Sequence, residues 1–345
     1  MVDNYVSAFA VCAPVAVDSA DMRSVRSSSI CFNHGLPGVS SRMTLAGIEM
    51  GGTKCVCTLG TGPDDIRAQQ TLPTRDPVTT LGAIADLLDR WQREFGRLHA
   101  IGIASFGPID LAPGSPTYGR IQSTPKELWR NCDLAGFFSS RFAAPLGLTT
   151  DVIGAALAEG RWGAARELSD FAYVTVGTGI GVGLIVAGKP VIGLHHPELG
   201  HIRIVRMAGD DWPGNCPFHG DCLEGLASGP SIQARCRRNS DTIPADDPVW
   251  ESVAHALAQL AHLLAVSVAP QRILIGGGVA TARPELFPRI RSLLTRSLNG
   301  YLDVPEVTSP EGLDRYLAPP GLGSGAGPLG SLAVAADCLH SATTP

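Results

Sequence analysis

Two glycine-rich segments of the chain have a pattern that suits phosphate binding. Residues 48–54 (IEMGGTK) and 176–183 (VGTGIGVG) each lead from an apolar strand through a glycine turn into a second apolar strand. Glycine lets the backbone approach a ligand closely, so N–H groups and a Thr hydroxyl can converge on phosphate oxygens. Either turn alone could be an ordinary hairpin. Two of them, one opening each half of the chain, predict a duplicated architecture that holds a nucleotide between two lobes.

A loop rich in Cys and His follows the second glycine turn. Residues 216–222 (CPFHGDC) form a C-x-x-H-x-x-C run, and His201 precedes it in the segment PELGH. Two thiolates and two imidazoles are a ligand set that structural zinc prefers, and four protein ligands leave no open position for a reacting group. A coincidental cluster, or His195 or His196 in place of His201, are the alternatives. The predicted zinc ligands are His201, Cys216, His219 and Cys222.

Asp151 is the candidate general base. It follows an apolar strand predicted at 146–149 and precedes a small-residue helix that starts within 155–159, so its carboxylate should project from a strand end into a cleft. Phosphoryl transfer from a bound nucleotide to a hydroxyl needs a group that accepts the proton of that hydroxyl. Asp at a strand-to-helix junction is also a common helix N-cap. The residues alone leave both interpretations open.

The elements that must position these residues alternate between strands and helices. Apolar residues recur at helical spacing after the first hairpin, and a loop rich in Gly, Pro and Ser spans 110–125. This alternation predicts the α/β class. Beyond the two hairpins, we expect strands at 100–104, 146–149 and 273–275, and helices at 77–91, 249–268, 284–298 and 329–339.

The composition is that of a chain able to bury two sizeable cores. It has 345 residues, 44% of them hydrophobic, and this length favours about two domains. A net charge of −5 gives no basic footprint for nucleic acid, and no apolar run is long enough to cross a bilayer. Most of the nine cysteines lie singly in apolar segments rather than in a disulfide framework, which predicts a cytoplasmic protein.

Residues 1–43 resemble nothing that follows. The stretch 18–42 is rich in Ser and Gly and lacks periodicity, so we expect a disordered extension, with Met43 as a candidate start. The mildly apolar segment 8–17 is the alternative sign of a signal peptide, although no basic residue precedes it and Pro14 interrupts it.

The order of these motifs over residues 44–342 resembles the ROK sugar kinases (repressor, open reading frame, kinase), and within them the zinc-containing fructokinase branch. The resemblance implies the two-lobed actin/Hsp70/hexokinase-like (ribonuclease H-like) fold with an interlobe cleft. It places the N-terminal α/β lobe at 44–150, completed by a C-terminal helix at 329–341. The C-terminal α/β lobe with the zinc loop then spans 151–328. A homodimer is also implied.

The resemblance assigns roles to individual residues. It makes Asp151 the base that deprotonates the sugar, and it places Glu49 where the wider fold has an Asp that helps to hold hydrated Mg²⁺. Thr150 stands where many relatives have Asn. The segment 118–129 resembles the variable loop that walls the sugar site, and Lys126 within it is interpreted as a solvated loop lysine, with a contact to a sugar oxygen as the alternative. Glu224 could instead be a carboxylate at a helix N-terminus. The implied ATP-binding residues are Glu49, Gly51, Gly52, Thr53, Lys54, Gly177, Thr178, Gly179, Gly276, Gly277 and Gly278, with Gly325 and Gly327 closing the adenosine site, and the implied sugar-binding residues are Glu198, His201 and Glu224.

The implied activity is ATP-dependent phosphorylation of a hexose, with fructose 6-phosphate as the expected product. Glucose, mannose and N-acetylmannosamine are the alternative substrates. The family also contains sugar-responsive transcriptional regulators, but the segment before the kinase core has too many Ser, Gly and Pro residues for a helix-turn-helix reader. A sugar-binding protein without catalysis is a further alternative, against which the presence of Asp151 argues.

Overall fold

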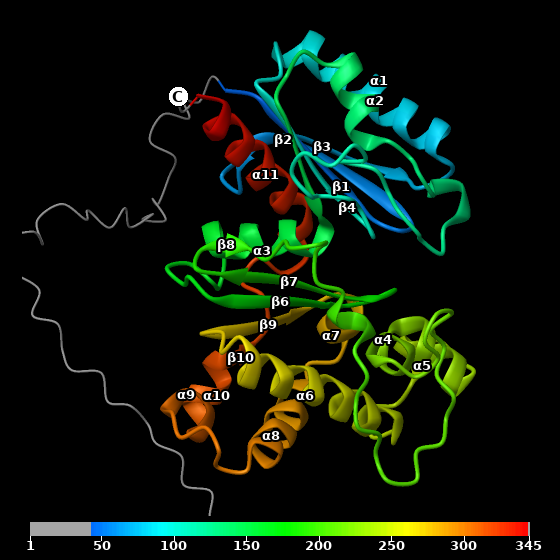
Figure 1. Ribbon diagram of the computed structural model, residues 1–345, viewed down its shortest axis with the longest axis vertical. Coiled ribbons are helices and arrows are strands. Elements are labelled where there is room, and N and C mark those ends of the chain that lie inside the picture. The colour runs from blue at the N-terminus through cyan, green and yellow to red at the C-terminus, as the bar shows by residue number, and fades with distance from the viewer. Residues whose placement is uncertain (1–42, 344–345) are drawn as a thin grey trace, which may run out of the picture. The chain divides into compact units, whose positions relative to one another are not determined.

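A computed structural model describes residues 43–343 of the chain (Figure 1). The expected extension therefore lies, apart from Met43, outside the described residues. The first half forms a mixed sheet of five strands in the order β3-β2-β1-β4-β5. Its strands are β1 (Leu45–Met50), β2 (Lys54–Gly62), β3 (Asp65–Pro73), β4 (Ala100–Ser105) and β5 (Leu146–Thr150).

The second half repeats this arrangement. Its sheet has the order β8-β7-β6-β9-β10, in which three antiparallel strands are followed by two parallel ones, as in the first sheet. The turn between β1 and β2 and the turn between β6 and β7 are each three residues long. The predicted duplication is therefore confirmed. The strands of the second sheet are β6 (Phe171–Val176), β7 (Ile180–Val186), β8 (Lys189–Pro190), β9 (Arg272–Gly276) and β10 (Leu317–Ala318).

The register of the parallel strands brings three chain segments to one edge of the first sheet. Met50 pairs with Ser105, and Ser105 pairs with Thr150, so these last strand residues lie side by side. The carboxyl ends of parallel strands meet at one sheet edge, where α/β proteins bind ligands. The first glycine turn and Asp151 are therefore neighbours because of strand register. In the second sheet, Thr175 pairs with Gly276, which brings the second glycine turn to the glycines after β9.

Two long helices each pack on the sheet formed by the other half of the chain. Helix α3 (Asp151–Trp162) follows the first sheet in the chain but packs on β6 and β7, whereas α11 (Ala326–Thr343) follows the second sheet and packs on β1, β2 and β4 (Figure 1). The helices also pack on each other, and they cross closest at Gly154 and Gly330. A Cβ on Gly330 would lie only 2.3 Å from the backbone carbon of Gly154. Small residues are therefore required where the helices cross.

The side chains of β1 alternate between two environments, as the period of two in a strand requires. Ala46, Ile48 and Met50 face the core under α1 (Pro77–Phe95) and α2 (Leu134–Arg141). Leu45 faces the opposite core, which contains residues of α11. Glu49 shares this second face, so its carboxylate points toward α11 instead of the α1 side.

The second sheet packs on α6 (Val249–Ser267) and α8 (Leu286–Leu298). By length and composition α6 could cross a membrane, but 61% of its apolar window is buried inside the protein, as in a core helix. The shorter helices are α4 (Leu223–Ala227), α5 (Gly229–Cys236), α7 (Gly278–Ala282), α9 (Pro305–Thr308), α10 (Pro310–Tyr316), η1 (Glu127–Trp129), η2 (Leu199–His201), η3 (Ser240–Thr242) and η4 (Gly323–Gly325).

Several element boundaries differ from the expectation, and three of these differences bear on the site. Helix α3 begins at Asp151 instead of Ala155, and α11 begins at Ala326 instead of Leu329. Strand β7 begins at Ile180, so Gly181 and Gly183 lie inside the strand and not in the turn. A Cβ on Gly183 would lie 2.2 Å from the carbonyl oxygen of Val152, so these glycines admit α3.

Candidate functional site

Asp151 is the first residue of α3, and Thr150 takes the N-cap position. The Thr150 hydroxyl accepts a hydrogen bond from the backbone N–H of Ile153 at 3.2 Å. The interpretation of Asp151 as the N-cap is therefore wrong. Its Oδ1 accepts only from the N–H of Val152, at 2.9 Å, among the bonds to its side chain within the described residues. Asp151 is thus a half-buried carboxylate at the sheet edge, and its second oxygen accepts no hydrogen bond within residues 43–343.

Glu49 and Asp151 place two interacting carboxylates at this edge of the first sheet. Burial raises the pKa of Asp151 to about 6. Burial, and then the charge of Asp151, raise the pKa of Glu49 to about 7, against the opposing effect of the Lys54 ammonium. Two partly buried carboxylates with too little positive charge beside them suit a divalent cation, which prefers oxygen ligands.

Gly327, near the start of α11, lies against Glu49. A Cβ on Gly327 would lie 2.0 Å from Oε1 of Glu49, so only glycine leaves room for this carboxylate. The sequence-based expectation put Gly327 at the adenosine site together with Gly325. The structure places Gly327 against Glu49, and its role at the adenosine site stays a prediction.

The first glycine turn is closed by its own backbone and braced by Thr74. The N–H of Gly51 donates to the carbonyl of Lys54 at 2.9 Å. The Thr74 hydroxyl donates to the carbonyl of Gly51 at 2.8 Å, and the Thr74 N–H donates to the carbonyl of Thr53 at 3.0 Å. Thr53 and Lys54 are exposed at the end of the turn. The turn is thus fixed from behind while its polar groups face outward.

Glu224 joins the second glycine turn to helix α4, which directly follows the Cys and His loop 216–222. The N–H of Gly177 donates to the carbonyl of Gly179 at 2.9 Å, which closes the turn around Thr178. Oε2 of Glu224, in the first turn of α4, accepts from the N–H of Ile180 at 3.0 Å. A Cβ on Gly179 would lie 2.7 Å from this oxygen. Glu224 therefore braces the turn, a contact that the sequence did not indicate.

The glycines after β9 lie beside the second turn. A Cβ on Gly177 would lie 3.8 Å from the backbone nitrogen of Gly278. Gly277 has φ +88°, and a Cβ there would meet the backbone of Val176 at 2.5 Å, so glycine is needed for both reasons. A Cβ on Gly276 would lie 2.8 Å from the hydroxyl oxygen of Tyr173. The predicted phosphate and adenosine segments of the second half are thus contiguous.

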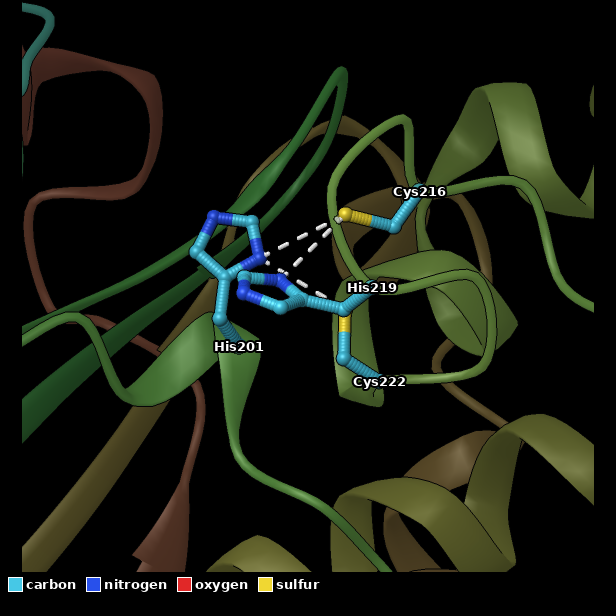
Figure 2. A group of neighbouring side chains, drawn as sticks. All are labelled: His201, Cys216, His219 and Cys222. Atoms are coloured by element: carbon cyan, nitrogen blue, oxygen red, sulfur yellow. Dashed lines mark hydrogen bonds between the residues drawn. The ribbon is translucent and has the colours of Figure 1, made fainter. Parts of the chain in front are cut away.

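The predicted His and Cys residues come together in one cluster (Figure 2). His201 Nδ1 lies 3.7 Å from the Cys216 sulfur and 3.5 Å from the Cys222 sulfur, and His219 Nδ1 lies 3.7 Å from the Cys216 sulfur. Tetrahedral ligands at about 2.3 Å (S) and about 2.0 Å (N) from zinc would stand roughly 3.5 Å apart. The four donor atoms all lie within 4.8 Å of one another. The residues and their spacing therefore fit one zinc ion.

The other two candidate histidines lie outside this cluster. Nε2 of buried His196 accepts from the N–H of Ile109 at 3.3 Å, and its Nδ1 lies 3.4 Å from Oε1 of Glu198. Burial lowers the pKa of His196. Burial raises the pKa of Glu198 to about 7, with further contributions from the charges of Asp151 and Glu224 and an opposing one from His195. Glu198, Asp151 and Glu224 are therefore close enough to interact electrostatically.

Sequence reasoning missed Thr74 and gave other roles to three further residues around the site. Thr74, His196 and Gly327 act through contacts described above, and Lys126 lies beside Gly52. The nearest signal for Lys126 was its place in a loop expected to wall the sugar site. The contacts of the other three have no sequence signal, because each contact joins distant segments of the chain.

Comparisons with known proteins identify the family. Residues 45–337 match the ROK family. The chain belongs to the ROK family. A fructokinase of Pediococcus pentosaceus is 42% identical over 300 residues, which make up 87% of this chain and 100% of the relative. A fructokinase of Streptococcus mutans is 38% identical over 84% of this chain and 96% of its own length.

A solved structure supports the same assignment. The ROK hexokinase from Thermus thermophilus superposes with a TM-score of 0.68 at 25% identity, covering 87% of this chain and 100% of that one. Together with the two five-stranded sheets, this likeness confirms the predicted two-lobed actin/Hsp70/hexokinase-like fold.

Proposed function

We propose that this ROK protein is an ATP-dependent fructokinase that makes fructose 6-phosphate. The observation that carries the proposal is the 42% identity to a fructokinase over that relative's entire length, with Asp151 present at the sheet edge between the two glycine turns. The fructokinase of Streptococcus mutans supports the same substrate.

In the proposed reaction, Asp151 accepts the proton of the fructose 6-hydroxyl. The hydroxyl oxygen forms a bond to the γ-phosphorus of ATP, and the bond from that phosphorus to the β-phosphate oxygen breaks to release ADP. Asp151 suits this role because one carboxylate oxygen is fixed by the N–H of Val152, while the other accepts no hydrogen bond within residues 43–343. A carboxyl with a pKa of about 6 is mostly charged at neutral pH and can therefore accept a proton.

The two glycine turns are proposed to hold the triphosphate through backbone N–H groups and the Thr53 and Thr178 hydroxyls, with Lys54 adding a charge. Glycines 276–278 are proposed to receive adenosine, because they adjoin the second turn. Glu49 would help to hold Mg²⁺, which neutralises phosphate charge when it is bound. Its raised pKa supports this role, since a cation would relieve the repulsion from Asp151.

We propose that the cluster binds a structural zinc ion. Its donor atoms match tetrahedral spacing, and four protein ligands leave no position for a reactant. His201 would use Nδ1 for the metal, so Nε2 could donate to a sugar hydroxyl. Glu198 and Glu224 are proposed as the acceptors of further sugar hydroxyls. Zinc would thus fix the loop that carries the sugar contacts.

We also propose a boundary between the lobes, an oligomeric state and a cellular location. The boundary between the lobes is placed at 150/151, with the C-terminal helix completing the first lobe, and the packing of α11 on the first sheet supports this division. A homodimer is proposed from family resemblance, and light scattering would test it. A cytoplasmic location is supported by the seven free cysteines within residues 43–343.

The test is Mg²⁺-ATP-dependent ADP release with fructose, glucose, mannose and N-acetylmannosamine, with the product analysed for the phosphorylated position. We expect selective turnover of fructose to the 6-phosphate. Turnover of another hexose alone would overturn the substrate assignment. Sugar binding without ADP release would favour a non-catalytic protein, and salt-dependent DNA binding would favour a regulator.

A further inference from the structure

Lys126 lies beside the first glycine turn, although it belongs to a loop much further along the chain. A Cβ built on Gly52 would lie 3.3 Å from Cε and 3.9 Å from Nζ of Lys126. The side chain thus passes directly over the glycine, and a larger residue at position 52 would displace it. Lys126 is half-buried, unlike the fully exposed lysine expected of a solvated loop.

A series of hydrogen bonds holds the Lys126 loop against the turn. The indole N–H of Trp129, a buried residue in η1, donates to the carbonyl of Arg75 at 2.8 Å. The preceding residue, Thr74, donates its N–H to the carbonyl of Thr53 in the turn itself. Trp129 also packs edge-on against Phe106, with ring centroids 5.3 Å apart. Lys126 is therefore placed by structure and is not a freely moving surface residue.

The ammonium of Lys126 has no acidic partner in the described part of the chain. No ion pair formed within residues 43–343 includes Lys126, and its nearest ring contact is Phe106, 6.0 Å from Nζ to the centroid. A half-buried ammonium that is held in place without a carboxylate suits an anionic ligand.

The use of lysine in this chain points to the same place. The sequence contains 27 Lys and Arg residues, of which only three are lysines, namely Lys54, Lys126 and Lys189. Arginine is therefore the ordinary cation of this protein, and two of the three lysines lie at the first glycine turn. Lysine is a compact point charge on a flexible stem, whereas the planar fork of arginine needs more room. The tight approach to Gly52 explains the choice of lysine.

We propose that Lys126 binds the phosphoryl group that is transferred. Lys126 reaches the first glycine turn from another loop, whereas Lys54 lies at the end of the turn itself. This inference rests on the proposed kinase function and adds a residue to it. Lys126 stays protonated throughout, because its role is to balance the charge of the equatorial phosphoryl oxygens while the proton of the sugar goes to Asp151. It would contact the γ-phosphate of ATP before transfer and the sugar phosphate after it.

The experiment compares Lys126→Met with Lys126→Arg and with Lys189→Met, which removes the exposed lysine of β8 as the matched control. Calorimetry measures the affinity for a non-hydrolysable ATP analogue, ADP and fructose, and steady-state assays measure kcat and KM. A charge-assisted hydrogen bond predicts roughly 10- to 100-fold lower kcat/KM for ATP in Lys126→Met. We expect weaker binding of the ATP analogue, unchanged binding of ADP and fructose, and partial recovery in Lys126→Arg.

Several outcomes would overturn the inference while leaving the kinase assignment intact. Lys126→Met kinetics equal to those of Lys189→Met would make Lys126 a surface lysine. Loss of fructose affinity with unchanged affinity for the ATP analogue would make it a sugar contact. Equal losses for ADP and the analogue would exclude a specific contact to the transferred group. Absence of turnover in the wild-type protein would instead count against the proposed kinase function itself.

Discussion

The charge of Asp151 is one of the causes that raise the pKa of Glu49 to about 7, although the two residues lie on different elements and far apart in sequence. The strand register explains the relationship, because β1 and β5 both flank β4 and end at the same edge. Glu49 enters this edge from the α11 face of β1, and Asp151 enters it as the first residue of α3. The pH dependence of activity is therefore expected to follow this pair of carboxylates.

Activity should depend on this pair through pH. Asp151 must be charged to accept a proton, so kcat/KM for fructose should fall as pH drops through the apparent pKa values of the coupled carboxylates, between about 6 and about 7. A pH–rate profile at saturating Mg²⁺-ATP checks this expectation. An acid limb that lies below pH 5 would contradict the burial of Asp151 described here.

Stability should show the opposite dependence for the same physical reason. The pKa of Glu49 is higher in the folded protein than in the unfolded chain. Its contribution to the free energy of unfolding is therefore most favourable at a pH below the pKa of the unfolded chain. This contribution is lost as the pH rises through about 7. Glu49→Gln, which cannot ionise, should therefore gain melting temperature relative to wild type at pH 8 but not at pH 4. Exposed Glu94 supplies the control, since Glu94→Gln should behave alike at both pH values.

Removal of a zinc ligand should weaken the sugar site more than the nucleotide site. Cys222→Ser should lose bound zinc, melt at lower temperature and show a raised KM for fructose, because the ligand loop carries the proposed sugar contacts. Cys236→Ser, at a cysteine of α5 outside the cluster, is the control. Elemental analysis gives the zinc content. Full zinc occupancy in Cys222→Ser would show that this residue is not a ligand.

Glu159 should be important for stability. Its side chain is fully buried, and it accepts backbone hydrogen bonds from Ala164 at 2.7 Å, Gly321 at 3.0 Å and Leu322 at 2.8 Å. Glu159→Ala leaves these donors without an acceptor and should lower the free energy of unfolding by roughly 2–4 kcal/mol. Glu159→Gln keeps one acceptor oxygen and should lose less. Denaturant titration checks the order; equal losses for both variants would contradict it.

The helix crossing gives a prediction in which two glycines respond with opposite sign. Gly330→Ala places a methyl group against Gly154 and should destabilise the protein by roughly 1–3 kcal/mol. Gly82→Ala, in α1, meets no atom within 4 Å and should stabilise it by roughly 0.5–1 kcal/mol. Thermal unfolding of both variants makes the comparison, and a neutral Gly330→Ala would show that the helices can move apart.

How much could be predicted from the sequence depends on how local each contact is. The His and Cys cluster was predictable because three of its four residues lie within one short loop, with His201 close before it. Lys126 was not, because its position depends on the bond from Trp129 to Arg75, which joins segments that share no pattern. Glu159 was hidden in the same way, since Gly321 and Leu322 reach it from the far end of the chain.

The glycine turns illustrate the intermediate case. Their sequence predicted tight turns, and strand pairing confirmed both. The sequence could not separate turn glycines from Gly181 and Gly183 inside β7, because both kinds lack a side chain for different reasons. The former lie in turns closed by backbone hydrogen bonds, whereas the latter admit helix α3.

We propose that Asp151 is the general base of a fructokinase, and a comparison of its Asn variant with wild type tests this role. Fructose-dependent ADP release is measured for wild type, Asp151→Asn and the exposed control Asp64→Asn, with fructose affinity measured in parallel by calorimetry. We expect kcat to fall by about 10²–10⁴ in Asp151→Asn alone, with fructose affinity nearly unchanged. A kcat of Asp151→Asn within tenfold of wild type would contradict it.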